Sequence, residues 1–161
     1  MNLEAARKKY RYVKSTGQII LRESKVRSEL VGKPMGTLNK DGYIYINVEG
    51  KAMLAHRLAW FLVMGVWPVE IDHKNTLKHD NRWRNLREAT RIENCGNAKT
   101  NKNNELGIKG VHLRKTTQRY RARLCRNGKS ISLGEFDTAE QAHAAYVAAA
   151  KKYFGEFART S

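Results

Sequence analysis

The sequence has few cysteines and no long apolar run, and each scarcity excludes a class of protein. Its 161 residues include two cysteines, Cys95 and Cys125, whose spacing suits neither a zinc knuckle nor a disulfide framework, so we expect both to be reduced. The longest apolar run, Leu58 to Trp67, is too short to span a bilayer, and the N-terminus lacks the apolar core of a signal peptide. These absences predict a cytoplasmic protein with no membrane partner.

Acidic residues are also scarce relative to basic ones. The chain has 15 Asp and Glu residues against 31 Lys and Arg, which gives a formal net charge of +16 at pH 7. Such an excess is typical of proteins that bind polyanions. A membrane surface is disfavoured because no helical pattern combines a Lys- and Arg-rich face with a bulky apolar face. Nucleic acid is therefore the expected partner, and the 41% of apolar residues suffice for one ordinary domain or two small ones.

The residues best suited to chemistry lie in one polar stretch in the middle of the chain. Asp72 and His73 stand side by side at the end of a short strand-like segment, and a polar loop follows them. Thr90 and Glu93 form a capping box, so we expect a helix to start at Thr90 and to carry Asn94 just after its first turn. Strand, loop and helix would then converge on one small site.

These residue types suit phosphodiester hydrolysis. A hard divalent ion such as Mg²⁺ needs only one or two protein oxygens when phosphate and water supply the rest, and Asp72 and the amide oxygen of Asn94 would be that pair. A histidine of ordinary pKa is largely neutral near pH 7, so His73 would take a proton from the attacking water. A surface ion pair or a satisfied turn is the competing interpretation of the same residues.

The stretch also resembles a known motif. The resemblance consists of an aspartate–histidine pair, an asparagine-led triplet after eleven intervening residues and a capping box followed by asparagine, namely Asp72-His73, Asn85-Leu86-Arg87, Thr90 and Glu93-Asn94. Together they look like the HNH endonuclease motif of the ββα-metal fold, in the variant with asparagine at the last position. The preceding residues 55–60 resemble the corresponding segment of phage and intron-encoded homing endonucleases.

The resemblance implies a role for each matched residue. Asp72 and Asn94 would be the metal ligands, His73 would be the general base, and Asn85 would hold the loop and orient His73 by hydrogen bonding. Asparagine at the last position favours a single hard ion, Mg²⁺ or Mn²⁺, over Ni²⁺ or Zn²⁺. His56, by contrast, is interpreted as a helix-start or packing histidine, because no residue at ligand spacing pairs with it.

The segments before the motif predict support for the site. Residues 1–14 are basic and form either an arm that lies on phosphates or a solvated face. Short strands and turns between residues 16 and 55 indicate a small antiparallel sheet with a hairpin at Glu49-Gly50. Apolar residues at helical spacing predict a core helix over residues 56–65 that ends at Gly65.

The last third of the chain predicts a second module. Residues 119–124 alternate with period two, so three arginines share one face of a strand and apolar side chains the other. Asn127-Gly128 makes a tight hairpin into a further strand, and Thr138 caps a helix that runs to about Phe154. Three strands packed on one helix would leave the arginine face open to the DNA major groove, or to solvent if the charges have no partner.

This module resembles the plant ethylene-response-factor (APETALA-type) DNA-binding domain, which also occurs in homing endonucleases. The main carrier of the resemblance is the run from Leu133 to Ala142, with Tyr120 in place of the usual tryptophan. Carried over by position, the DNA-binding face would hold seven residues: His112, Arg114, Arg119, Arg121, Arg123, Ser130 and Ser132. Because several reading positions differ in type, the target sequence of the plant domain is not carried over.

The sequence thus predicts an α+β chain with a small N-terminal sheet and a ββα-metal nuclease motif, linked to a three-stranded antiparallel sheet packed on one helix. We expect a nuclease domain at residues 1–97, a linker at 98–106 and a DNA-binding domain at 107–161. The expected function is cleavage of double-stranded DNA by a homing-type endonuclease, acting as a monomer without a small-molecule cofactor, in a bacterial host cell if phage-encoded. The alternatives are a non-catalytic DNA-binding regulator with a decayed nuclease site and an RNA-binding or RNA-cutting protein, which the narrow A-form major groove disfavours.

Overall fold

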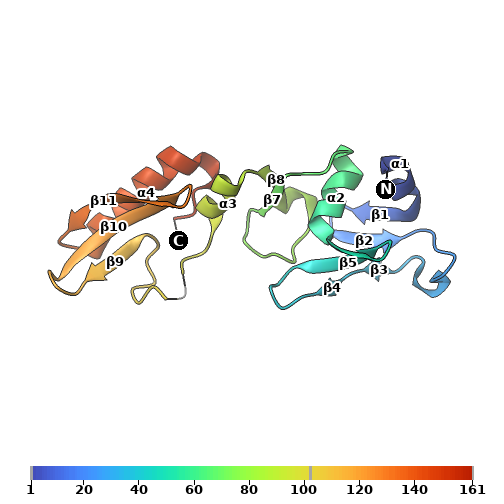
Figure 1. Ribbon diagram of the computed structural model, residues 1–161, viewed down its shortest axis with the longest axis horizontal. Helices are drawn as coiled ribbons and strands as arrows, with labels where there is room; N and C mark the ends of the chain where they lie inside the picture. The colour runs from blue at the N-terminus through green and yellow to red at the C-terminus, as the bar shows by residue number, and fades with distance from the viewer. Residues whose placement is uncertain (1, 102, 161) are drawn as a thin grey trace. The chain divides into compact units, whose positions relative to one another are not determined.

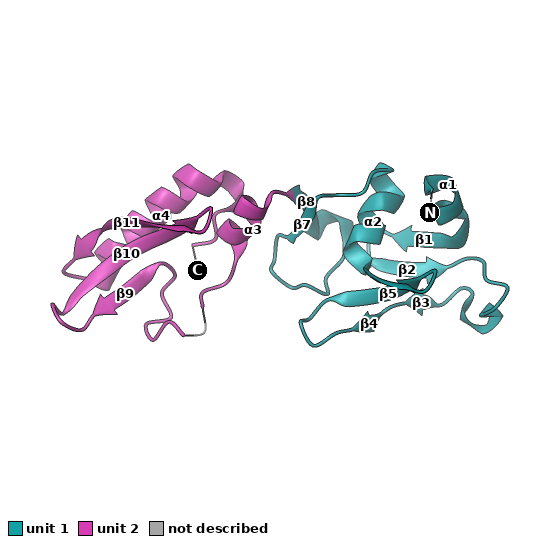
Figure 2. Ribbon diagram, in the orientation of Figure 1, with its two compact units in different colours: residues 1–88 teal, residues 89–161 magenta. Residues whose placement is uncertain are grey.

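The computed structural model describes residues 2–101 and 103–160, which form short helices and small sheets (Figure 1). The α+β class predicted from the sequence is confirmed. The chain divides into two compact units, Met1–Glu88 and Ala89–Ser161 (Figure 2). This division falls nine residues before the expected end of the nuclease domain, and the domain limits at residues 97 and 107 stay predictions. No helix among the described residues is long and apolar enough to cross a bilayer.

The first unit contains three small sheets and a central helix. The strand orders of the three sheets are β1-β2-β3, β4-β5-β6 and β7-β8. The single N-terminal sheet expected from the sequence is therefore two sheets, β1-β2-β3 and β4-β5-β6. The β5–β6 hairpin turns at Glu49 and Gly50, both at positive φ, as predicted. The elements in chain order are α1 (Leu3–Lys9), β1 (Tyr10–Val13), β2 (Gln18–Leu21), η1 (Ser28–Leu30), β3 (Pro34–Met35), β4 (Thr37–Leu38), β5 (Ile44–Val48), β6 (Lys51–Leu54), α2 (Ala55–Met64), β7 (Glu70–His73), η2 (Trp83–Asn85) and β8 (Leu86–Ala89).

The basic N-terminal segment is a folded part of this unit and not an arm. The Asn2 side chain caps α1 by accepting a hydrogen bond from the backbone N–H of Ala5 at 2.8 Å. Ala6 and Tyr10 are buried in the core, while Lys8 and Arg11 stay exposed. The interpretation as an arm is therefore wrong, because the apolar residues between the charges have a core to join.

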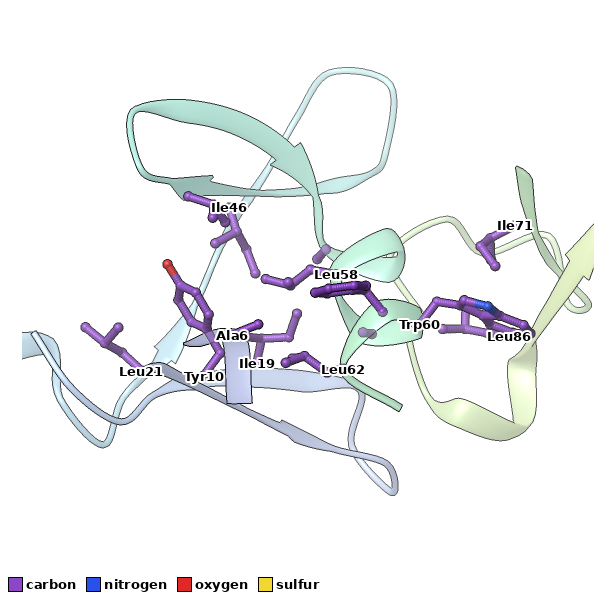
Figure 3. Close-up of a cluster of buried hydrophobic side chains, with 14 residues drawn as sticks. Ala6, Tyr10, Ile19, Leu21, Ile46, Leu58, Trp60, Leu62, Ile71 and Leu86 are labelled. Atoms are coloured by element: carbon purple, nitrogen blue, oxygen red, sulfur yellow. The ribbon is translucent and has the colours of Figure 1, made fainter. Parts of the chain in front are cut away.

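Helix α2 is the centre of the first core. Leu58 and Ala59 are fully buried, and the helix ends at Gly65 in the left-handed conformation, as predicted. Figure 3 shows Leu58 and Leu62 on the side of the N-terminal strands and Trp60 on the side of Ile71 and Leu86. One helix thus ties the N-terminal sheets to the β7–β8 pair that carries the candidate site.

The second unit packs a three-stranded antiparallel sheet against one helix, as predicted. The sheet order is β11-β10-β9, and α4 covers the face that carries Ala122 and Leu124. The buried residues of α4 are Ala142, Tyr146, Ala150 and Phe154. The elements are α3 (Arg91–Asn97), β9 (Val111–Arg114), β10 (Arg119–Arg126), β11 (Lys129–Phe136), α4 (Ala139–Phe154) and η3 (Gly155–Phe157).

Helix α3 belongs to this second core. Gly96 lies so close to Phe154 that an added Cβ would sit 2.7 Å from the ring, and Ile92 packs on the same cluster. The expected linker after α3 has no helix or strand among its described residues, but it contains a local turn. The amide of Asn104 donates to the Ile108 carbonyl at 2.7 Å and accepts from the Leu106 N–H at 3.2 Å.

Candidate active site and nucleic-acid interface

Strand β7 delivers the two residues that the motif places at its centre. Asp72 and His73 are 7% and 5% exposed, so both functional side chains are buried at the end of the strand. Neighbouring side chains in a strand point to opposite faces, so Asp72 and His73 have different neighbours. Asp72 contacts Arg87 on β8, whereas His73 contacts the loop that follows β7 and two aromatic rings.

Arg87 holds the carboxylate of Asp72. Its Nε and Nη2 atoms donate to the same oxygen, Oδ2, at 2.8 and 2.7 Å, and both side chains are largely buried. A charge taken out of water needs such a counter-charge with good hydrogen-bond geometry. Arg87 is part of the predicted motif, but the sequence did not assign it this role; an arginine on the strand paired with the aspartate is the signal that points to it.

The imidazole of His73 is neutral and oriented. Its Nε2 lies 3.0 Å from the amide oxygen of Asn81, and because that oxygen only accepts, Nε2 carries the hydrogen and Nδ1 the lone pair. Burial lowers the pKa of His73 below 6.5, although the hydrogen bond to Asn81 and the nearby charges of Asp72 and Asp80 act in the opposite direction. The neutral ring is therefore the form present at pH 7, and it can accept a proton at Nδ1.

Asn85 holds the loop, but the hydrogen bond to His73 comes from a different residue. The Asn85 amide accepts from the backbone N–H of Asn75 at 2.9 Å and donates to the carbonyl of Asp80 at 2.7 Å, which closes the loop after β7. The predicted hydrogen bond from Asn85 to His73 is therefore corrected to one from Asn81, which is 1% exposed. Sequence reasoning missed Asn81 because a single asparagine in an Asn-rich loop carries no distinguishing pattern.

Two rings pack around His73. The His56 ring lies nearly perpendicular to the His73 ring, with centroids 4.9 Å apart, and the Tyr43 ring is 6.1 Å from His73 and 5.5 Å from His56. Burial, and then the neighbouring His73 and Arg57, lower the pKa of His56 to about 3. The structure confirms His56 as a packing histidine in the first turn of α2, but its contact with His73 was not foreseen.

Asn94, the second predicted metal ligand, lies on α3 of the second unit. The capping box before it is confirmed, since Glu93 Oε2 accepts from the Thr90 N–H at 2.7 Å and Thr90 Oγ1 accepts from the Glu93 N–H at 3.3 Å. The Asn94 N–H donates to the Thr90 carbonyl at 3.0 Å, so Asn94 follows the first turn, as predicted. Its pairing with Asp72 at a metal stays a prediction. The described residues contain no group of three or more His, Cys, Asp or Glu side chains that could hold a metal ion. The predicted site would use one carboxylate and one amide, so it is not a group of that kind.

The second unit presents the predicted cationic face. Arg119, Arg121 and Arg123 alternate with buried or half-buried residues on β10 and are all exposed. On β9, His112 pairs with Arg121 and Arg114 pairs with Arg119, so both share this face. A hollow of about 250 Å³ lies among the side chains of β9 and β10, lined by His112, Leu113, Arg114, Arg121 and Arg123. Burial, followed by the charges of the nearby arginines, lowers the pKa of His112.

A β-bulge decides which residues of β11 share the arginine face. The pairing shifts between Ala122 and Arg123, so that Arg123 pairs with Ser132 before the bulge and Arg121 pairs with Glu135 after it. Ser130 and Ser132 are exposed on this face, as predicted. The bulge also turns Glu135 onto it, which strict alternation along the strand did not predict.

The four arginines of the face are not equivalent. Glu135 forms an ion pair with Arg114 at 2.6 Å, and Asp137 forms one with Arg119 at 3.1 Å. Arg121 and Arg123, by contrast, form no ion pair within the part of the chain that the structure describes. These two guanidinium groups are therefore the ones most readily offered to an anionic partner.

Two family models match this chain. Residues 53–95 match the family model described as HNH endonuclease, and residues 106–156 match the one described as AP2 domain. The first match contains Asp72, His73, Asn85 and Asn94, and the second contains β9, β10, β11 and α4.

Two further proteins are similar to this chain. A solved structure, described as "DNA binding and cleavage by the HNH homing endonuclease I-HmuI", is 27% identical with a TM-score of 0.42; it covers 56% of this chain, which spans about half (51%) of that one. An uncharacterised HNH endonuclease of Acanthamoeba polyphaga mimivirus is 36% identical over 132 residues, which cover 80% of this chain and 67% of the relative. The chain therefore belongs to the HNH endonuclease family, and its C-terminal unit contains an AP2 domain.

Proposed function

We propose that the protein is a metal-dependent DNA endonuclease that hydrolyses phosphodiester bonds and holds duplex DNA with its C-terminal sheet. The observation that carries the proposal is the state of His73, a buried neutral imidazole whose Nε2 is engaged by Asn81 and whose Nδ1 keeps its lone pair. A general base needs that form at its working pH. Family membership and the matched motif residues support the same reaction.

In the proposed reaction His73 Nδ1 takes the proton from a water molecule as that water attacks the phosphorus atom. Asn81 keeps the imidazole from turning, and the rings of His56 and Tyr43 limit its tilt. Asn85 keeps the loop closed around this arrangement. The chain itself therefore supplies a base of fixed orientation, and orientation is a large part of what positioned groups contribute to rate.

We assign the metal-ligand positions to Asp72 and to the amide oxygen of Asn94, which occupy those positions in the family motif. The donor chemistry fits Mg²⁺ or Mn²⁺, because a buried carboxylate and an amide are hard oxygen donors and His73 Nε2 is already engaged by Asn81. Such an ion, when bound, would stabilise negative charge on the phosphate and on the leaving oxygen. Arg87 keeps Asp72 in place through Oδ2.

DNA binding is assigned to the arginine face of the AP2 domain. A two- or three-stranded antiparallel ribbon fits the major groove, where arginine takes guanine edges by two hydrogen bonds. The exposed and unneutralised Arg121 and Arg123 support this assignment, and His112, Arg114, Arg119, Ser130 and Ser132 complete the proposed face. With one active centre per chain, a monomer would cut one strand.

The proposal is tested with supercoiled plasmid that carries the natural target, incubated with the protein and Mg²⁺, with and without a chelator. We expect nicked product that disappears when the chelator is present and when Asp72 is replaced by Ala. Tight, salt-sensitive DNA binding without any product would contradict the enzyme and would instead identify a DNA-binding regulator whose nuclease site has decayed.

A further inference from the structure

Residues 1–52 lie outside both family matches, yet part of this region contacts the candidate active site. Strands β1 and β2 form a hairpin whose register runs from Tyr10 opposite Leu21 to Val13 opposite Gln18. The turn of this hairpin and the strand before it lie against the loop that carries Asn81, which is the residue that hydrogen-bonds His73. The hairpin therefore contacts Asn81, and Asn81 in turn contacts the proposed base, His73.

Three contacts join the hairpin to this loop. The Tyr12 hydroxyl donates to the backbone carbonyl of Asn81 at 2.6 Å, and the backbone N–H of Trp83 donates to the backbone carbonyl of Lys14 at 3.0 Å. Gly17, at φ +79°, packs so closely that an added Cβ would lie 2.5 Å from the Asn81 carbonyl carbon. Burial raises the pKa of the Tyr12 hydroxyl far above its ordinary value, so the hydroxyl stays protonated and keeps donating.

The contacts of Tyr12 and Gly17 both meet the backbone carbonyl group of Asn81. Asn81 is 1% exposed, and its side-chain oxygen accepts a hydrogen bond from His73 Nε2. Residues more than sixty positions away in sequence thus add to the hydrogen bonds by which Asn85 closes the loop, since the loop itself contains little apolar side chain to bury. A shift of Asn81 would lengthen the hydrogen bond that selects the Nε2–H tautomer of His73.

We propose that the β1–β2 hairpin is a positioning element of the nuclease centre, in which Tyr12 and Gly17 hold Asn81 so that His73 keeps its Nε2–H tautomer and its Nδ1 lone pair. Tyr12, Gly17 and Asn81 are positioning residues, since none of them is expected to touch the substrate. The catalytic consequence rests on the proposed function, whereas the tautomer of His73 is independent of it.

The chain offers matched controls for both substitutions. Tyr12→Phe removes one hydroxyl oxygen, and Tyr10→Phe makes the same change in the same strand at a tyrosine without a hydrogen bond to the loop. Gly17→Ala introduces a Cβ against Asn81 at positive φ, whereas Gly50→Ala introduces one at φ +81° with no atom within 4 Å. The control glycine thus carries the same backbone strain without the contact.

The direct test is the imidazole ¹⁵N spectrum of the full-length protein at pH 7.5, with His73 assigned by its loss in His73→Gln. The wild type, Tyr10→Phe and Gly50→Ala are expected to show His73 as the Nε2–H tautomer alone. Tyr12→Phe and Gly17→Ala are expected to show a mixture of the two tautomers. A pure Nε2–H tautomer in folded Tyr12→Phe would overturn the proposal, and this variant decides the matter if Gly17→Ala fails to fold.

Kinetics provide a second readout that a merely structural role would not move. We expect Tyr12→Phe to lower kcat about tenfold, the scale of a modestly misplaced catalytic group, with the Kd for DNA unchanged. In a His73→Ala background the same substitution should have no further effect, because residues that act through one group are not additive. An equal loss in both backgrounds would overturn the proposal. If no variant cleaves DNA, the proposed function fails while the tautomer test still stands.

Discussion

The rings of His56 and His73 meet edge to face, with centroids 4.9 Å apart, inside a core that excludes water from both. Burial and the neighbouring His73 and Arg57 lower the pKa of His56 to about 3. Burial disfavours a charge on either ring, and the neighbouring His73 further disfavours a charge on His56. The arrangement therefore links the stability of the first unit to pH.

Stability should fall as the pH is lowered from 7 to 5. In that range the unfolded chain binds a proton at His56, whose unfolded pKa is near 6.5, while the folded chain does not. The unfolded state gains protons, so the free energy of unfolding drops by about 2 kcal/mol for this residue, and the loss continues down to about pH 3. Urea unfolding of wild type and His56→Leu at pH 7 and pH 5 measures it. An identical pH dependence in the two proteins would contradict the account.

Arg87→Met should destabilise the first unit strongly. The substitution removes the guanidinium that contacts Asp72 Oδ2 and leaves a largely buried carboxylate without that cation, which costs about 3–5 kcal/mol. The further change Asp72→Asn should restore part of this loss, since it removes the buried charge. Lys8→Met, which breaks an exposed pair with Glu23 at 3.9 Å, is the control and should cost less than about 1 kcal/mol. Equal midpoints of unfolding for the two single variants would refute this.

Loss of Arg121 and Arg123 should weaken binding to duplex DNA more than loss of two other positive charges. The double variant Arg121→Ala/Arg123→Ala removes the arginines of the sheet face that form no ion pair among the described residues. Lys151→Ala/Lys152→Ala makes the same charge change on α4, which covers the opposite face of the sheet. For Arg121→Ala/Arg123→Ala we expect at least a tenfold loss of affinity at 0.15 M salt. For Lys151→Ala/Lys152→Ala we expect a smaller loss that is the same for all DNA sequences. Equal losses would argue against the sheet as the DNA-binding surface.

Glu135→Gln should strengthen DNA binding. Glu135 is carried onto the arginine face by the β-bulge and forms an ion pair with Arg114 at 2.6 Å, so its removal takes away a negative charge and releases an arginine. A severalfold increase in affinity, with a steeper dependence on salt, is expected from titrations at several ionic strengths. Glu140→Gln, on an exposed residue of α4, is the matched control and should change the affinity less. Unchanged affinity in Glu135→Gln would mean that this face does not meet DNA.

Features set by neighbours in sequence were predictable. The capping box of Thr90 and Glu93 and the end of α2 at Gly65 depend on residues within one turn, so their patterns are visible in the sequence. The Asn127-Gly128 hairpin depends on two adjacent residues that both adopt positive φ. The alternation of β10 likewise needs no knowledge of its partner strands.

Features set by distant residues were not predictable from one sequence. Asn81, the partner of His73, has a backbone carbonyl that accepts a hydrogen bond from the Tyr12 hydroxyl, 69 positions away in sequence. The placement of Glu135 depends on a one-residue shift in pairing, which leaves no pattern in β11 alone. The folded state of residues 2–14 depends on a core that contains Ala6 and Tyr10. In each case the local sequence is compatible with more than one arrangement, and a contact with residues distant in sequence determines which one forms.

The central claim is that His73 is the base of a nuclease, and the cleavage rate of His73→Ala tests it most directly. The matched control is His79→Ala, which removes an exposed histidine from the same loop. Single-turnover cleavage of target DNA at saturating Mg²⁺ should fall by a factor of about 10²–10⁴ in His73→Ala, the usual contribution of a general base, and should be nearly unchanged in His79→Ala. Cleavage by folded His73→Ala protein at the wild-type rate would contradict the account.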